Sequence, residues 1–164
     1  MEIEDLNKRV DEYKASLATV VDKKLLWRSS VKDKISMTLR AVAARYDIGW
    51  RVQELSWLYN NEAVNIGFDS FPTAISEKAD LIPSYQFMKG GALVFSQSYS
   101  GDIEVFLLFP DFKNNSSGQS SLEMGIYTPV DITEDLILEK VDGFLKEMIK
   151  WELPALKDKV GFMN

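Results

Sequence analysis

The chain contains no cysteine and no histidine. Without cysteine there can be no disulfide bond, no cysteine nucleophile and no zinc–cysteine cluster. Without histidine, Ser-His and Cys-His catalysis and histidine-ligated metal sites are excluded. The nine glycines form neither of the phosphate-binding patterns G-x-x-x-x-G-K-[ST] and G-x-G-x-x-G. The sequence therefore lacks most of the patterns from which a reaction could be inferred, and it indicates no cofactor.

Long apolar runs and an excess of positive charge are missing as well. No run approaches the roughly 20 apolar residues of a membrane-spanning helix, so we expect no membrane partner. The formal net charge is −6, which disfavours a nucleic-acid partner. The opening residues, MEIEDLNKRVDE, lack the apolar stretch of a secretory signal, so we expect a cytoplasmic protein.

Apolar residues, by contrast, are plentiful. Of the 164 residues, 46% are hydrophobic and 12% are aromatic, which indicates a folded globule and not a disordered chain. The length suits one domain with a sizeable core, so we expect residues 1–164 to form a single domain.

The stretch Ala92–Pro110 predicts the central hairpin of a sheet. Two apolar runs flank Ser100-Gly101, a pattern typical of a hairpin with a two-residue turn. With that turn, Phe95 would lie opposite Phe106, on the same face of the sheet. Because the base of the hairpin is apolar on both faces, we expect helices or a partner to cover each face.

A second hairpin is predicted over residues 50–69, with Asn60-Asn61 as its turn. In the register that this turn sets, Leu55 and Val64 would lie on the same face of the sheet and belong to one apolar stripe. A fifth strand is predicted over Leu122–Thr128, where Pro129 ends it.

Three helices are predicted around these strands. The first covers residues 3–27, and a capping box at Ser30–Asp33 would open the second. Thr133 is a good N-cap for the third, which would run to about Leu153. The predicted fold class is therefore α+β: a mostly antiparallel five-stranded sheet, made of two hairpins plus one strand, packed by two N-terminal helices and one long C-terminal helix.

The first helix carries a heptad-like apolar seam, with spacings of 3, 4, 3, 4 and 3 residues. Its members are Ile3, Leu6, Val10, Tyr13, Leu17 and Val20. The seam ends at the next heptad position, which is Lys24. One interpretation is a coiled-coil contact between two copies, and the other is a helix packed against its own sheet.

Aromatic residues provide a second candidate surface. Core packing explains most aromatic side chains, but a group of them could line an apolar pocket or meet a protein partner. The residues chosen for this surface are Tyr85, Phe87, Phe95, Tyr99, Phe106 and Trp151. A cavity bounded by Phe95, Phe106 and Trp151 would favour a small apolar ligand.

Four carboxylates in predicted strands are weak candidates for a metal site. They are Glu54, Asp69, Asp102 and Glu104. Gathered on one face, they could hold Mg²⁺ or Mn²⁺ for hydrolysis, because both ions prefer oxygen ligands. The alternative is ordinary acidic residues that face solvent and discourage edge pairing.

These observations favour a non-catalytic cytoplasmic protein-interaction module, with a protein partner or a second copy as its ligand. A homodimer is one form that this module could take. The alternatives are a small apolar-ligand-binding domain and a carboxylate-dependent divalent-metal hydrolase.

Overall fold

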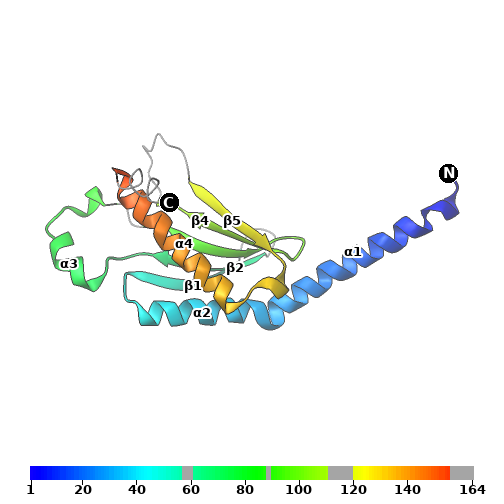
Figure 1. Cartoon of the computed structure of the whole chain (residues 1–164), viewed down its shortest axis with the longest axis horizontal. Coiled ribbons are helices and arrows are strands. Elements are labelled where there is room, and N and C mark those ends of the chain that lie inside the picture. The colour runs from blue at the N-terminus through cyan, green and yellow to red at the C-terminus, as the bar shows by residue number, and fades with distance from the viewer. Residues whose placement is uncertain (57–60, 88–89, 111–119, 156–164) are drawn as a thin grey trace.

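The computed structural model describes residues 1–56, 61–87, 90–110 and 120–155. Within these ranges the chain has an α+β fold, in which helices pack against one five-stranded antiparallel sheet (Figure 1). The N-terminal helix extends away from the rest of the molecule, which we call the body (Figure 1). None of the described helices combines the length and the apolar content needed to cross a bilayer.

The strands follow one another across the sheet in chain order, and each pairs antiparallel with the next. They run over Trp50–Ser56 (β1), Glu62–Phe68 (β2), Ala92–Gln97 (β3), Ile103–Leu108 (β4) and Ser121–Tyr127 (β5). The predicted fold class is confirmed. Because every strand lies beside its neighbour in sequence, no parallel crossover connection is needed.

Four α-helices accompany the sheet in the part of the chain that the structure describes. They are α1 (Asn7–Leu26), α2 (Lys32–Arg45), α3 (Thr73–Ala79) and α4 (Glu134–Glu152). The N-cap of α4 is the predicted one, since the Thr133 hydroxyl accepts a hydrogen bond from the backbone N–H of Leu136 at 3.1 Å. Glu134 and Asp135 place favourable negative charge in its first turn.

α1 and α2 form one continuous helical segment, joined by the π-helical turn Trp27–Val31. The predicted capping box at Ser30–Asp33 is wrong, because the backbone stays helical through the turn and no side chain caps α2. Instead, the hydroxyls of Ser29 and Ser30 donate to the carbonyl oxygen of Leu26, at 3.4 and 3.3 Å. Figure 1 shows that α1 and α2 point in different directions, so the segment bends at this turn.

One face of the sheet carries the hydrophobic core, to which α2 and α4 both contribute. Its fully buried members include Ile35 and Leu39 from α2, Ile66 from β2, Leu93 and Phe95 from β3, Val105 and Leu107 from β4, and Ile137 and Phe144 from α4. On the opposite face Val94 is buried outside this cluster, Phe106 is half-buried and Glu104 is exposed. The two helices therefore shield the central hairpin on its core face.

The register of the central hairpin differs from the predicted one. The pairing is displaced by one residue, so Phe95 and Phe106 lie on opposite faces of the sheet. The loop is longer than two residues, because the backbone N–H of Ser98 still donates to the carbonyl of Asp102, at 2.8 Å. Gly101 lies inside this loop with a φ of 89°, as in three-residue hairpin loops that end in a left-handed residue.

The outer hairpin, β1–β2, also pairs differently from the prediction. Leu55 and Val64 lie on opposite faces and not in one apolar stripe. In the observed register Trp50 faces Phe68, and their rings stack with centroids 5.5 Å apart. The predicted turn residue Asn60 lies outside the described residues.

Candidate functional site

α1 is exposed over most of its length. All residues from 1 to 19 are exposed, and Val20 is the first half-buried residue of the helix. Figure 1 shows that this part of α1 extends beyond the sheet and the other helices. Contacts with the body are found at its last turns, where Lys23 and Lys24 meet the loop between β3 and β4. Residues 1–19, which include the 3-10 turn Ile3–Leu6 and more than half of α1, thus form a projecting arm.

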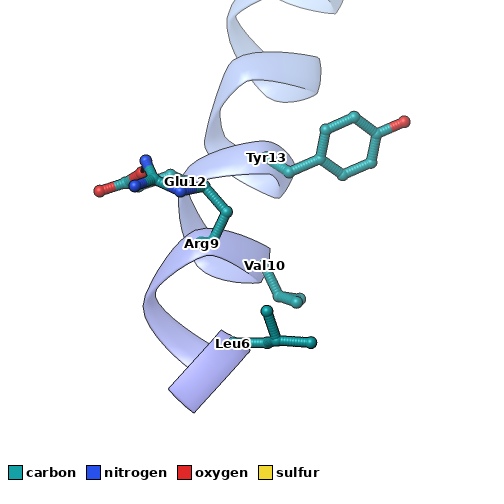
Figure 2. A pocket seen from close by; sticks show the side chains of 5 residues that line it. All are labelled: Leu6, Arg9, Val10, Glu12 and Tyr13. Carbon is teal, nitrogen blue, oxygen red and sulfur yellow. Dashed lines mark hydrogen bonds and ion pairs between the residues drawn. The ribbon is translucent and has the colours of Figure 1, made fainter. Parts of the chain in front are cut away.

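Five of the six predicted seam residues lie on this arm. Their exposed fractions are 83% for Ile3, 46% for Leu6, 45% for Val10, 62% for Tyr13 and 46% for Leu17. Figure 2 shows Leu6, Val10 and Tyr13 on one side of the helix, while Arg9 and Glu12 form an ion pair on another side. The five residues drawn in Figure 2 line a shallow depression whose surface is mostly apolar. The interpretation that the helix packs against its own sheet therefore does not hold for residues 3–19.

The face that carries the seam continues into the body. The ammonium group of Lys24, at the next heptad position, lies 4.7 Å from the centre of the Tyr99 ring. Beside it, Lys23 Nζ lies 2.8 Å from Asp102 Oδ1. Gly101 approaches the last turn of α1 so closely that a Cβ atom on Gly101 would lie 2.6 Å from the Cβ of Lys23. The loop between β3 and β4 therefore holds the base of α1 and covers the end of the seam.

A second group of contacts fixes the π-helical turn to the outer hairpin. Lys32 Nζ lies 2.6 Å from the Glu62 carboxylate and 3.7 Å from that of Glu54. The buried Trp27 donates from Nε1 to Glu62 at 3.3 Å. The hydrogen bond between Lys32 and Glu62 lowers the pKa of Glu62 and raises the pKa of Lys32. Since each charge has a partner, this group serves as an anchor for the helical segment.

The six candidate aromatic residues do not form one surface, and only Tyr99 and Phe106 among them line a common shallow pocket in the described part of the chain. Phe95 is fully buried in the core, whereas Phe106 lies on the opposite face of the sheet. Tyr99 is exposed at the base of α1, and Tyr85 is exposed in the connection before β3. Phe87 in that connection packs its edge against Phe71, with ring centroids 4.8 Å apart.

Phe95, Phe106 and Trp151 do not bound the expected ligand cavity. Trp151 is half-buried near the end of α4. Because Phe95 has no exposed surface and Phe106 lies across the sheet, neither can line a common opening with Trp151.

The four strand carboxylates are dispersed. Asp69 lies 3.0 Å from Arg51, Asp102 pairs with Lys23, and Glu54 belongs to the anchor around Lys32. Glu104 lies on the opposite face of the sheet from Glu54 and is exposed. Among the described residues, no group of three or more carboxylates is arranged to hold a metal ion.

Comparison of the chain with protein-family models, curated proteins and solved structures finds no match. The function is therefore inferred from the geometry of the chain alone. That geometry includes one feature that the sequence did not reveal, namely the attachment of α1 to the β3–β4 loop. Lys23 and Asp102 are 79 positions apart, and no local pattern indicates that such distant charges will meet.

Proposed function

We propose that this chain is a non-catalytic protein-interaction module that binds its partner through the exposed seam of α1. The observation that carries the proposal is the arrangement of five apolar seam residues on an arm that the other described parts of the chain leave exposed. An apolar stripe in water gains roughly 25 cal/mol for each Å² that a partner buries. The seam has the heptad spacing of helices that pair with helices, so the partner surface is a second apolar helix.

The composition of the arm supports this interpretation. Apart from the seam, the residues of α1 before Val20 are charged, polar or alanine. A narrow stripe at the first and fourth heptad positions is typical of a coiled-coil seam, whereas a helix that covers a sheet needs a wider stripe. α4 has that wider stripe and packs on the sheet. The narrower stripe of α1 therefore goes together with its position away from the sheet.

The carboxylates support a structural role over a catalytic one. Asp69, Asp102 and Glu54 each lie within ion-pair distance of a lysine or an arginine. A paired carboxylate can hold two elements together, as Asp102 does for α1 and the β3–β4 loop. A cytoplasmic location remains a prediction from the sequence.

The test compares charge placed on the seam with the same charge placed elsewhere on the arm. The seam variant carries Leu6→Lys and Leu17→Lys. The matched control carries Ala15→Lys and Ala18→Lys, which add the same two charges at exposed positions away from the seam. Circular dichroism would confirm that both variants keep their helices.

Two readouts are needed, because the partner can be a second copy or another protein. Sedimentation equilibrium would give the mass of each chain, and affinity purification from cell extract would identify the proteins bound to it. We expect the seam variant to lose mass or partners that the wild type and the control keep. If all three chains are monomeric and retain the same proteins, the seam is not an interaction surface and the proposal is wrong.

A further inference from the structure

We infer that the partner of the seam is α1 of a second copy of this chain, running antiparallel to the first; this inference rests on the proposed function. The spacings 3, 4, 3, 4 and 3 read the same in both directions, so two identical seams can pair head to tail along their full length. In that arrangement Leu6 of each copy lies against Leu17 of the other, and Val10 lies against Tyr13. Ile3 of each copy reaches Val20 of the other.

The position of the body favours the antiparallel orientation. The loop between β3 and β4 covers the seam face of α1 from about Val20 onwards, through Lys24 and Tyr99. A parallel second helix would continue along that face and would meet this loop. An antiparallel second arm ends at Ile3, the first residue of its 3-10 turn, which is level with Val20, where the loop begins. The two bodies then lie at opposite ends of the helix pair and do not compete for space.

Acidic residues lie at the start of the arm, and basic residues lie at the end of α1. The acidic residues are Glu2, Glu4 and Asp5, and the basic residues are Lys23 and Lys24 in the last turn of α1. Antiparallel pairing directs the acidic start of each copy towards the basic end of α1 in the other, whereas parallel pairing would place the two acidic starts side by side, where like charges repel. Antiparallel pairing also sets the helix dipoles in opposite directions, so that the two N-terminal ends do not lie together.

The flanking residues of the seam argue against the parallel orientation. In a parallel coiled coil, residues that flank the seam contact residues five positions further along the other helix. Arg9 of one copy would then lie beside Lys14 of the other, and like charges across a seam are unfavourable. Antiparallel pairing removes this contact.

Side-chain size agrees with the antiparallel orientation. Parallel pairing would place Tyr13 against Tyr13 in one layer and Val10 against Val10 in the next. Antiparallel pairing places one Tyr13 against one Val10 in each of the two central layers. Alternation of large and small side chains across facing positions fills such layers evenly.

The absence of native cysteine makes the orientation directly measurable. Leu6→Cys and Leu17→Cys would be made as separate chains, one of them with a mass tag, and treated with a short bismaleimide alone and after mixing. Lys8→Cys, at an exposed position away from the seam, would be the control. Both seam residues are exposed in the monomer, so these substitutions do not endanger its fold. Sedimentation equilibrium of the wild type would be measured alongside.

We expect a wild type of twice the monomer mass, and a cross-linked product that forms at least tenfold faster in the mixture of Leu6→Cys and Leu17→Cys than in either chain alone. Rapid cross-linking of Leu6→Cys alone would show parallel helices and would overturn the inference. A monomeric wild type would overturn it too, but the proposed function would stand if the seam variant loses a protein that the wild type retains. Equal cross-linking of Lys8→Cys would show random collision and would also overturn the inference.

Discussion

Lys32 at the start of α2 and Glu62 at the start of β2 form a close ion pair, with Nζ 2.6 Å from Oε2. Glu62 also accepts a hydrogen bond from Trp27 in the π-helical turn. The carboxylate thus joins three elements at the place where the helical segment bends. The direction of the arm depends on this bend, so the pair contributes to the geometry of the candidate interaction surface.

Glu62→Gln is expected to lower the free energy of unfolding at neutral pH by roughly 0.5–1 kcal/mol, because the pair is partly exposed to solvent. The folded pKa of Glu62 is lowered, so its contribution is present above the pKa of an unfolded glutamate, about 4.3, and is lost as pH falls through the folded value. The pKa of Lys32 is raised, so its contribution is present below about 10.4 and is lost at higher pH. Urea unfolding over a pH series would measure both limits.

The difference between wild type and Glu62→Gln should therefore shrink in acid and in strong alkali. Asp142→Asn is a suitable control, because its pair with Lys146 is highly exposed on α4 and should contribute little. A difference for Glu62→Gln that is as large at about pH 3 as at about pH 7 would contradict the prediction.

Gly101→Ala is expected to destabilise the protein by at least about 1–2 kcal/mol, the usual cost of a left-handed conformation for a residue with a Cβ atom. The new methyl group would also lie 2.6 Å from the Cβ of Lys23, which is close to the helix backbone and cannot easily move. Thermal unfolding would measure the loss of stability. Hydrogen exchange should show earlier opening of the last turn of α1, and unchanged exchange there would contradict the proposed role of the loop.

Gly143→Ala is also a glycine-to-alanine change, but it is expected to keep or raise the stability of the protein, in contrast to Gly101→Ala. Gly143 lies inside α4 with ordinary helical geometry, so alanine should gain roughly 0.5–1 kcal/mol of helix propensity. Its Cβ would meet the terminal methyl group of Met124 at 2.8 Å, and that flexible end can move aside. We expect equal or higher stability in urea unfolding. A loss above about 1 kcal/mol would mean that Met124 is held rigidly.

The sequence allowed the strands and the main helices to be predicted, but it did not allow the pairing register of the strands to be predicted. Apolar alternation located the strands of the central hairpin, and Thr133 located the start of α4. Ser100-Gly101 suits a two-residue turn, yet Gly101 serves as the left-handed residue of a longer loop. Two-residue turns and three-residue hairpin loops both use glycine for its positive φ, so the presence of glycine does not show which of the two forms.

The candidate site could be predicted in part. Heptad spacing identified the seam residues from Ile3 to Leu17, but the same spacing also occurs in helices that pack on their own domain. The position of α1 argues against packing of residues 3–19 on their own sheet, and this position depends on contacts between Lys23 and Asp102 and between Lys32 and Glu62. Such pairs join residues far apart in sequence, and therefore no local pattern reveals them.

The observed register of the central hairpin predicts unequal effects at its two phenylalanines. Phe95→Ala removes a fully buried ring from the core and should cost about 3–5 kcal/mol. Phe106→Ala removes a half-buried ring from the opposite face and should cost less than half as much. Urea unfolding of both variants would measure the difference. Equal losses would place both rings in one core, which requires the two-residue turn and would contradict the observed pairing of β3 with β4.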